Sequence, residues 1–161
     1  MSITSNPTAA AIAVEAVHKR YGAVAALKAV TLHVQRGEFF GLLGPNGAGK
    51  STLINIIAGL TRFDSGRVTV LGQDVVREYR HTRRAIGVVP QEVVFDPFFS
   101  VREVLEIQSG YFGIDRRANA AWIDELLDTL MLTEKSGANM RALSGGMKRR
   151  VMIAQALVHK P

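Results

Sequence analysis

Cysteine is absent from this sequence of 161 residues. The chain therefore has no disulfide framework and no cysteine-ligated metal, which is compatible with a reducing compartment. No apolar run approaches the roughly 18 residues that a membrane-spanning helix needs. Residues 1–11 are small and polar, lack the cationic start and apolar core of a secretion signal, and are expected to form a flexible tail. These absences predict a cytoplasmic protein, so any membrane-spanning part would belong to another chain.

The composition that remains is that of an ordinary soluble protein. Apolar residues make up 47% and charged residues 21%, and the length suits one domain with a real core. Basic residues exceed acidic ones and give a net charge of +6. That charge suits a partner with phosphate groups, and it equally suits simple solubility. Composition alone leaves the kind of function open.

The pattern G-x-x-x-x-G-K-[ST] at residues 44–51 predicts a loop that wraps phosphates. It lies between an apolar run at residues 39–43 and a stretch with helical apolar spacing at residues 52–60. Glycines let successive N–H groups turn towards anionic oxygens, and the N-terminus of the following helix also favours anions. Lys50 adds a cation for the β- and γ-phosphates, and Ser51 offers a hydroxyl to Mg²⁺. The predicted nucleotide-binding residues here are Gly44, Pro45, Asn46, Gly47, Ala48, Gly49, Lys50, Ser51 and Thr52.

The first half of the chain is expected to be an α/β core, residues 12–91, with a small antiparallel element before a parallel sheet. Strands are predicted at residues 12–17, 30–34, 39–43, 67–71 and 85–89. The strand at residues 39–43 is expected to be buried and to lead into the phosphate loop. Asp74 is a candidate cap for a short helix containing Arg77, Arg80, Arg83 and Arg84, which we interpret as a solvated face.

The second half, residues 92–161, is expected to be an α-helical subdomain. Ser100 with Glu103 fits a capping box, and Asp115 and Ser144 are candidate caps for two further helices. The apolar residues of each stretch recur at the spacing of an amphipathic helix. The sequence therefore predicts three helices after residue 100.

The third of these helices begins Leu143-Ser144-Gly145-Gly146-Met147, about 95 residues after Lys50. Together with the phosphate loop, this stretch resembles the L-S-G-G-Q signature of the ATP-binding cassette (ABC) ATPases. The resemblance implies an α/β phosphate-loop fold, ATP and Mg²⁺ as ligands, and ATP hydrolysis by the full-length protein. It also implies that Ser144, Gly145 and Gly146 contact the γ-phosphate of ATP held by an opposite subunit, so that a dimer, expected to be a homodimer, is formed.

Two further positions match this family. Tyr21 stands where the family places an aromatic residue that stacks on adenine. Gln91 matches the family's glutamine loop, which reaches Mg²⁺ and the attacking water. Judged as single residues, Tyr21 is also consistent with an ordinary aromatic at a strand end and Gln91 with a surface loop residue.

The residues after the signature suggest a subgroup. Met147 replaces the usual glutamine and is followed by Lys148-Arg149-Arg150. This combination is similar to the ATPase subunits of bacterial exporters whose membrane subunits are separate chains. The resemblance implies a permease partner, a position at the cytoplasmic face of the membrane and no direct nucleic-acid partner.

Two other interpretations were weighed. A cassette ATPase that acts on ribosomes or nucleic acid is the alternative, because the net charge would serve phosphate contacts. A simple phosphate-loop kinase or GTPase would leave residues 143–147 unexplained, and no guanine-reading Asn-Lys-x-Asp run occurs.

No catalytic residue is expected within this chain. In the family, a buried strand after the signature helix ends in Asp, a catalytic Glu follows, and a His comes later. The sequence ends at Pro161, where that strand would begin. Transfer of a phosphoryl group to water needs an oriented nucleophile. We therefore expect an incomplete sheet, and little or no ATP hydrolysis by these 161 residues alone.

Overall fold

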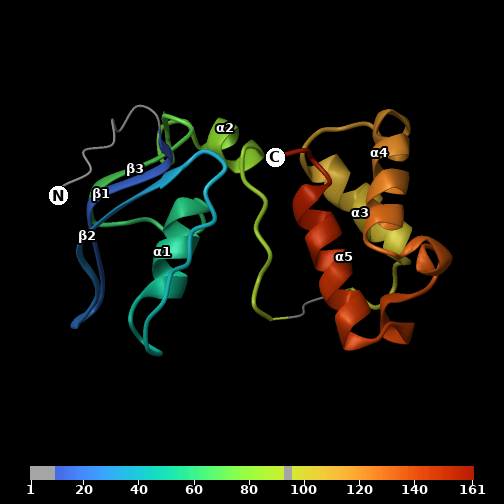
Figure 1. Cartoon of the computed structure of the whole chain (residues 1–161), viewed down its shortest axis with the longest axis horizontal. Helices are drawn as coiled ribbons and strands as arrows, with labels where there is room; N and C mark the ends of the chain where they lie inside the picture. The colour runs from blue at the N-terminus through green and yellow to red at the C-terminus, as the bar shows by residue number, and fades with distance from the viewer. Residues whose placement is uncertain (1–9, 93–95) are drawn as a thin grey trace. The chain divides into compact units, whose positions relative to one another are not determined.

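The computed structural model describes residues 10–92 and 96–161. The chain forms two compact units, Met1–Ala85 and Ile86–Pro161. The first unit contains the described strands and two short helices, and the second contains three longer helices (Figure 1). Among the described residues, none of the helices combines the length and apolar character needed to cross a lipid bilayer.

The sheet of the first unit is antiparallel throughout. Its strands are β1 (Ala10–Tyr21), β2 (Val24–Gln35), β3 (Ser65–Val70) and β4 (Gln73–Asp74), in the order β2-β1-β3-β4. Val14 of β1 pairs with Leu32 of β2 on one side and with Val68 of β3 on the other. The predicted antiparallel element is confirmed. Its strands are longer than expected, and β1 includes Ala10 and Ala11 of the predicted tail.

Two predicted strands of a parallel core are wrong. Residues 39–43 and 85–89 belong to no strand, and Phe39 and Leu43 have exposed fractions of 99% and 93%. A strand forms only where a neighbour accepts and donates its backbone hydrogen bonds, and neither segment has such a neighbour among the described residues. The apolar character of these segments was therefore read correctly, but their burial was not.

Helix α1 (Lys50–Ile57) follows the glycine loop, as predicted, although it begins and ends earlier than expected. Helix α2 (Tyr79–Arg84) also exists, but it begins after Arg77, which was expected within it, and Asp74 is not its N-cap. The Asp74 carboxylate instead accepts the N–H groups of Val76 and Arg77 in a turn before the helix, at 2.9 and 3.0 Å. Asp74 favours such turns because its short side chain reaches backbone groups two residues ahead.

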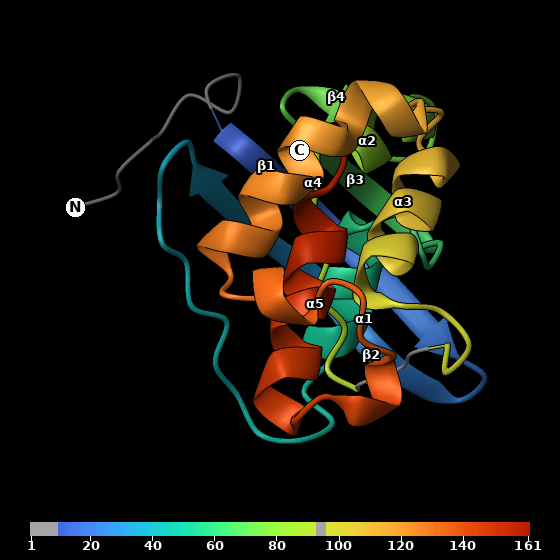
Figure 2. The same ribbon diagram turned by 90° about the vertical axis from the view of Figure 1, so that its right-hand side faces the viewer.

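The second unit is built on α3 (Val101–Tyr111), α4 (Arg116–Thr129) and α5 (Gly145–Leu157), with the 3-10 helices η2 (Thr133–Lys135) and η3 (Met140–Ala142) between the last two. The three α-helices pack side by side (Figure 2). All three predicted caps are confirmed: the Ser100 and Glu103 capping box, Asp115, and Ser144. The shared core of this unit contains Leu105, Ile123, Leu127, Leu132 and Val151.

Buried polar contacts hold the C-terminal end of α5 in this unit. The Asn119 amide of α4 donates to the Ser109 hydroxyl of α3 and to the Val158 carbonyl, both at 2.9 Å. The Trp122 indole donates to the Leu157 carbonyl at 3.1 Å. Because buried polar groups must be hydrogen-bonded, these contacts fix the end of α5 against α3 and α4.

Candidate functional site

The phosphate loop bends sharply into α1 at two glycines. Gly47 and Gly49 have φ angles of 82° and 86°, in the left-handed region that glycine adopts without strain. A Cβ on Gly49 would lie 2.4 Å from the Ala26 carbonyl oxygen of β2. Glycine is therefore required at position 49, both because of the backbone conformation there and because β2 passes so close.

Lys50 is the first residue of α1, and its ammonium group folds back onto the loop. Its Nζ donates to the carbonyl oxygens of Gly44 at 2.6 Å and Pro45 at 2.7 Å. Both acceptors belong to the loop itself, so the charge of Lys50 lies inside the curve of residues 44–49. An anion bound in the loop would take these donors over from the two carbonyls, since a charged acceptor forms the stronger hydrogen bond.

The N-terminus of α1 is open to an anion. No side chain caps it, and its first turn carries no acidic residue. The first N–H groups of a helix have no acceptor within the helix, and the helix dipole adds a positive field there. The Ser51 side chain is exposed in this first turn and Thr52 follows it half-buried. The loop and the helix end together bring a positive charge and backbone N–H donors to one place, as in sites that bind phosphate.

Ser51 carries the kind of oxygen donor that a magnesium ion prefers. No group of three or more His, Cys, Asp or Glu side chains among the described residues is suited to hold a metal ion. Mg²⁺ usually keeps several waters and takes few protein ligands beside the phosphates of its nucleotide. The exposed Ser51 hydroxyl would supply one such ligand.

Tyr21 ends β1 with an exposed fraction of 51%, so its side chain is accessible to solvent. The Lys19 ammonium lies 5.1 Å from the ring centroid, a cation–π contact that orients the ring. Sequence reasoning missed the residue that holds this end of β1. The Asp64 carboxylate accepts the Arg20 N–H at 2.7 Å and the Lys19 ammonium at 3.3 Å.

These contacts also act on the acidity of Asp64. The hydrogen bond from the Arg20 N–H, together with the charge of Lys19, holds the pKa of the Asp64 carboxyl below its usual range. In the sequence, Asp64 is marked only by the turn pattern Asp-Ser-Gly. Its hydrogen-bond partners lie more than 40 residues away in the chain, so no local pattern indicates these contacts.

The signature stretch begins α5 in the second unit. The Ser144 hydroxyl accepts the Met147 N–H at 3.2 Å and so caps the helix. Gly145 and Gly146 follow it and are exposed, and a Cβ at either position would meet nothing within 4 Å among the described residues. Within this chain their packing does not require glycine. The two residues leave the helix N-terminus open to the approach of another molecule.

Gln91 lies in the second unit and has an exposed side chain. Its backbone carbonyl accepts a hydrogen bond from the Arg149 guanidinium of α5 at 2.7 Å, and the same nitrogen lies 3.1 Å from the Pro90 carbonyl. Arg149 therefore positions the backbone of Gln91, whereas the sequence analysis used Arg149 only as evidence for the subgroup of the family. Nothing local to residues 148–150 indicated this contact.

The first unit combines an antiparallel sheet with a glycine loop that leads into a helix, and the helical unit contains a second helix that begins with glycines. This combination defines the class of nucleotide-binding phosphate-loop proteins. The particular family follows from comparison with known proteins. The sequence pattern of the family described as ABC transporter matches residues 27–161, and the chain belongs to this family.

Relatives of known name are similar along most of this chain. The Nod factor export ATP-binding protein I of Rhizobium etli is 48% identical over 145 residues, which is 90% of this chain and 46% of that protein. The protein of the same name from Paraburkholderia xenovorans is 42% identical over 152 residues, 94% of this chain and 50% of that protein. The chain therefore spans about half the length of these relatives.

Solved structures share the fold. One described as the ATP-binding subunit of an ABC transporter has a TM-score of 0.82 and 29% identity, over 93% of this chain and 62% of that one. An ATP-binding cassette of an ABC transporter in its ADP conformation has a TM-score of 0.79 and 28% identity, over 94% of this chain and 66% of that one. These likenesses confirm the predicted fold class.

Proposed function

We propose that this chain is the ATP-binding portion of the ATPase subunit of an exporter. The exporter would be of the same type as the Nod factor export proteins to which this chain is similar. The observation that carries the proposal is the phosphate loop, in which the Lys50 ammonium lies against the loop carbonyls at the N-terminus of α1, and no side chain caps that N-terminus. The similarity to the Nod factor export proteins over 90% of the chain supports export as the process that ATP drives.

In this proposal each candidate site residue of the first unit named below has a defined role. Lys50 exchanges its carbonyl acceptors for the β- and γ-phosphates of ATP, and the N–H groups of residues 47–52 bind phosphate oxygens. Ser51 holds Mg²⁺ together with those phosphates. Tyr21 stacks its exposed face on adenine, because the flat ring and the base both lose apolar surface to water.

The second unit is proposed to act on a nucleotide held by another subunit. Ser144, Gly145 and Gly146 would approach its γ-phosphate, where the N-terminus of α5 favours negative charge. In contrast to these signature residues, Gln91 is proposed to contribute to the Mg²⁺ site of its own subunit, with its backbone positioned by Arg149. Closure of two such subunits around ATP would move a separate membrane permease, and hydrolysis by the whole protein would reset it.

Equilibrium binding of a fluorescent ATP analogue with Mg²⁺ tests the first step. The proposal predicts saturable binding that Lys50→Ala weakens by at least about tenfold, since a charged hydrogen bond of about 1.5–3 kcal/mol is lost. Lys28→Ala removes an exposed lysine of β2 and should leave binding unchanged. Unlabelled ATP should compete.

Two results would overturn the proposal. One is an affinity that stays the same in Lys50→Ala, and the other is an absence of saturable binding by a chain whose circular dichroism shows a folded protein. Competition by GTP that equals that by ATP would contradict the assignment of ATP as the nucleotide.

A further inference from the structure

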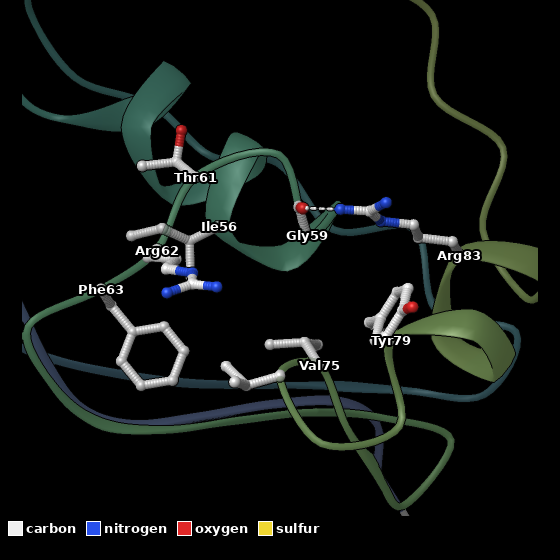
Figure 3. A pocket seen from close by; sticks show the side chains of 9 residues that line it. Ile56, Gly59, Thr61, Arg62, Phe63, Val75, Tyr79 and Arg83 are labelled. Atoms are coloured by element: carbon white, nitrogen blue, oxygen red, sulfur yellow. Dashed lines mark hydrogen bonds between the residues drawn. The ribbon is translucent and has the colours of Figure 1, made fainter.

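A second candidate binding site lies in the first unit and includes no residue of the phosphate loop. It is a cavity of about 320 Å³. The C-terminal turn of α1, the segment that follows it, the residues after β4 and helix α2 form its walls (Figure 3). Pockets for small molecules in proteins begin at about 300 Å³, so this cavity is large enough for a small organic ligand.

One part of the lining is apolar. Ile56 and Val75 are buried side chains that line it, and the aromatic rings of Phe63 and Tyr79 lie on opposite sides of the open space (Figure 3). A flat or aliphatic body placed between these side chains would bury apolar surface on both of its faces.

The rest of the lining is positively charged. Arg62 and Arg83 border the cavity, and none of the described residues that line it is acidic. Three carboxylates are next to lining residues in the sequence, and each accepts other hydrogen bonds: Asp64 from Lys19 and the Arg20 N–H, Asp74 from two backbone N–H groups, and Glu78 from the Asp74 N–H. Among the described residues, the lining itself therefore has two guanidinium groups and no carboxylate.

The two arginines differ in how they are held. Arg83 donates to the Gly59 carbonyl at 2.5 Å, and its guanidinium carbon lies 5.4 Å from the centroid of the Tyr79 ring. These contacts fix Arg83 as part of the wall. The Arg62 guanidinium has no hydrogen bond or ion pair within residues 10–92 and 96–161, so its donors are available to a ligand.

We propose that this cavity binds a small organic anion, whose phosphate or carboxylate pairs with Arg62 and whose apolar body lies against Val75 between Phe63 and Tyr79. A planar guanidinium binds such oxyanions with two parallel hydrogen bonds, which makes Arg62 the residue that selects for charge. The site goes beyond the proposed binding of ATP and is independent of Lys50.

Titration of the chain with phenyl phosphate, followed by ¹H–¹⁵N NMR, tests the proposal. The titration uses the wild type and Lys50→Ala, because the second removes the main cation of the phosphate loop. Saturable shifts are expected at Thr61, Val75 and Tyr79 in both proteins. Inorganic phosphate should bind at least about tenfold more weakly, because it has no apolar body to bury.

The matched variants are Arg62→Gln and Arg67→Gln, which remove the same charge from exposed positions. Arg67 lies on β3 and does not line the cavity. Arg62→Gln should weaken phenyl phosphate binding about tenfold or more, and Arg67→Gln should change it less than about twofold.

Three outcomes would overturn the proposal. They are equal binding by Arg62→Gln and the wild type, equal binding of inorganic and phenyl phosphate, and shifts that map only to residues 44–52. Loss of ATP binding in Lys50→Ala with intact phenyl phosphate binding would support this site independently of the ATP site.

Discussion

The Arg149 guanidinium of α5 donates a hydrogen bond of 2.7 Å to the backbone carbonyl of Gln91, 58 residues earlier in the chain. The same guanidinium lies 3.1 Å from the Pro90 carbonyl. The helix that begins with the signature glycines therefore also holds the segment that carries Gln91.

Arg149→Ala should increase the mobility of residues 90–92. The Pro90 and Gln91 carbonyls, both within the described part of the chain, would lose the side-chain hydrogen-bond donor that they share. We expect faster backbone motion at Gln91 and Glu92, measured by ¹⁵N relaxation. Arg141→Ala removes another exposed arginine of the same unit and serves as the control. Unchanged relaxation in Arg149→Ala would show that other contacts hold the segment.

Gly49→Ala should destabilise the first unit. The substitution places a Cβ at a φ of 86° and 2.4 Å from the Ala26 carbonyl oxygen, so either α1 or β2 must shift. Strain of this kind costs about 1–3 kcal/mol, which chemical denaturation measures. Gly146→Ala is the control, because its Cβ would meet nothing within 4 Å. It should leave the stability unchanged or slightly increased, and equal losses in both variants would contradict the steric argument.

The stability of the second unit should fall at acid pH because of His159. Burial lowers the pKa of His159, while the hydrogen bond of 3.1 Å between its Nε2 and the Ile86 carbonyl acts in the opposite direction. Its ring stacks on Phe112 at 3.8 Å between centroids, and within the described chain its buried Nδ1 has no hydrogen-bond partner. A proton on Nδ1 would therefore be buried without an acceptor.

The sign of the effect follows from linkage. The folded pKa lies below the unfolded value of about 6.5, so the unfolded chain binds the proton more readily. The stabilisation is complete above about pH 6.5 and is lost as the pH falls through the folded pKa. Denaturation midpoints at about pH 8 and about pH 5 should differ more for the wild type than for His159→Phe. His81→Phe, at an exposed position of α2, should behave like the wild type.

Met131→Gly should stabilise the protein. Met131 follows the C-cap of α4 with a φ of 53°, and its side chain is 75% exposed, so it loses little packing when removed. Glycine adopts this conformation without the penalty of a Cβ, a difference of about 1 kcal/mol. Met131→Ala keeps the Cβ and should give no such gain in the denaturation midpoint. A gain of the same size in Met131→Ala would contradict this explanation.

Local sequence signals predicted the helix starts of the second unit well. The Ser100, Asp115 and Ser144 side chains each accept N–H groups two or three residues ahead, and the Glu103 carboxylate accepts the Ser100 N–H three residues behind, so each cap depends on neighbours in the sequence. The phosphate loop was recognised for the same reason, because its glycines and lysine act within a few residues of one another. Roles proposed for Tyr21, Gln91 and Ser144 towards ATP remain predictions.

Sequence reasoning failed where a partner lies far along the chain. Residues 39–43 and 85–89 have the apolar character of core strands, yet a strand also needs a neighbouring backbone, and the described residues provide none. The links from Arg149 to Gln91 and from Asp64 to Arg20 were missed because no pattern in either segment names its partner.

By itself, the sequence determined the phosphate loop, the caps and the family, since these depend on residue types at short, fixed spacings. Tertiary structure alone decided which apolar segments are buried and where Lys50 directs its charge. It also decided that Arg62, Arg83 and Tyr79 line one cavity. The physical reason is that burial, backbone pairing and charge proximity arise between residues distant in sequence, and only folding brings those residues together.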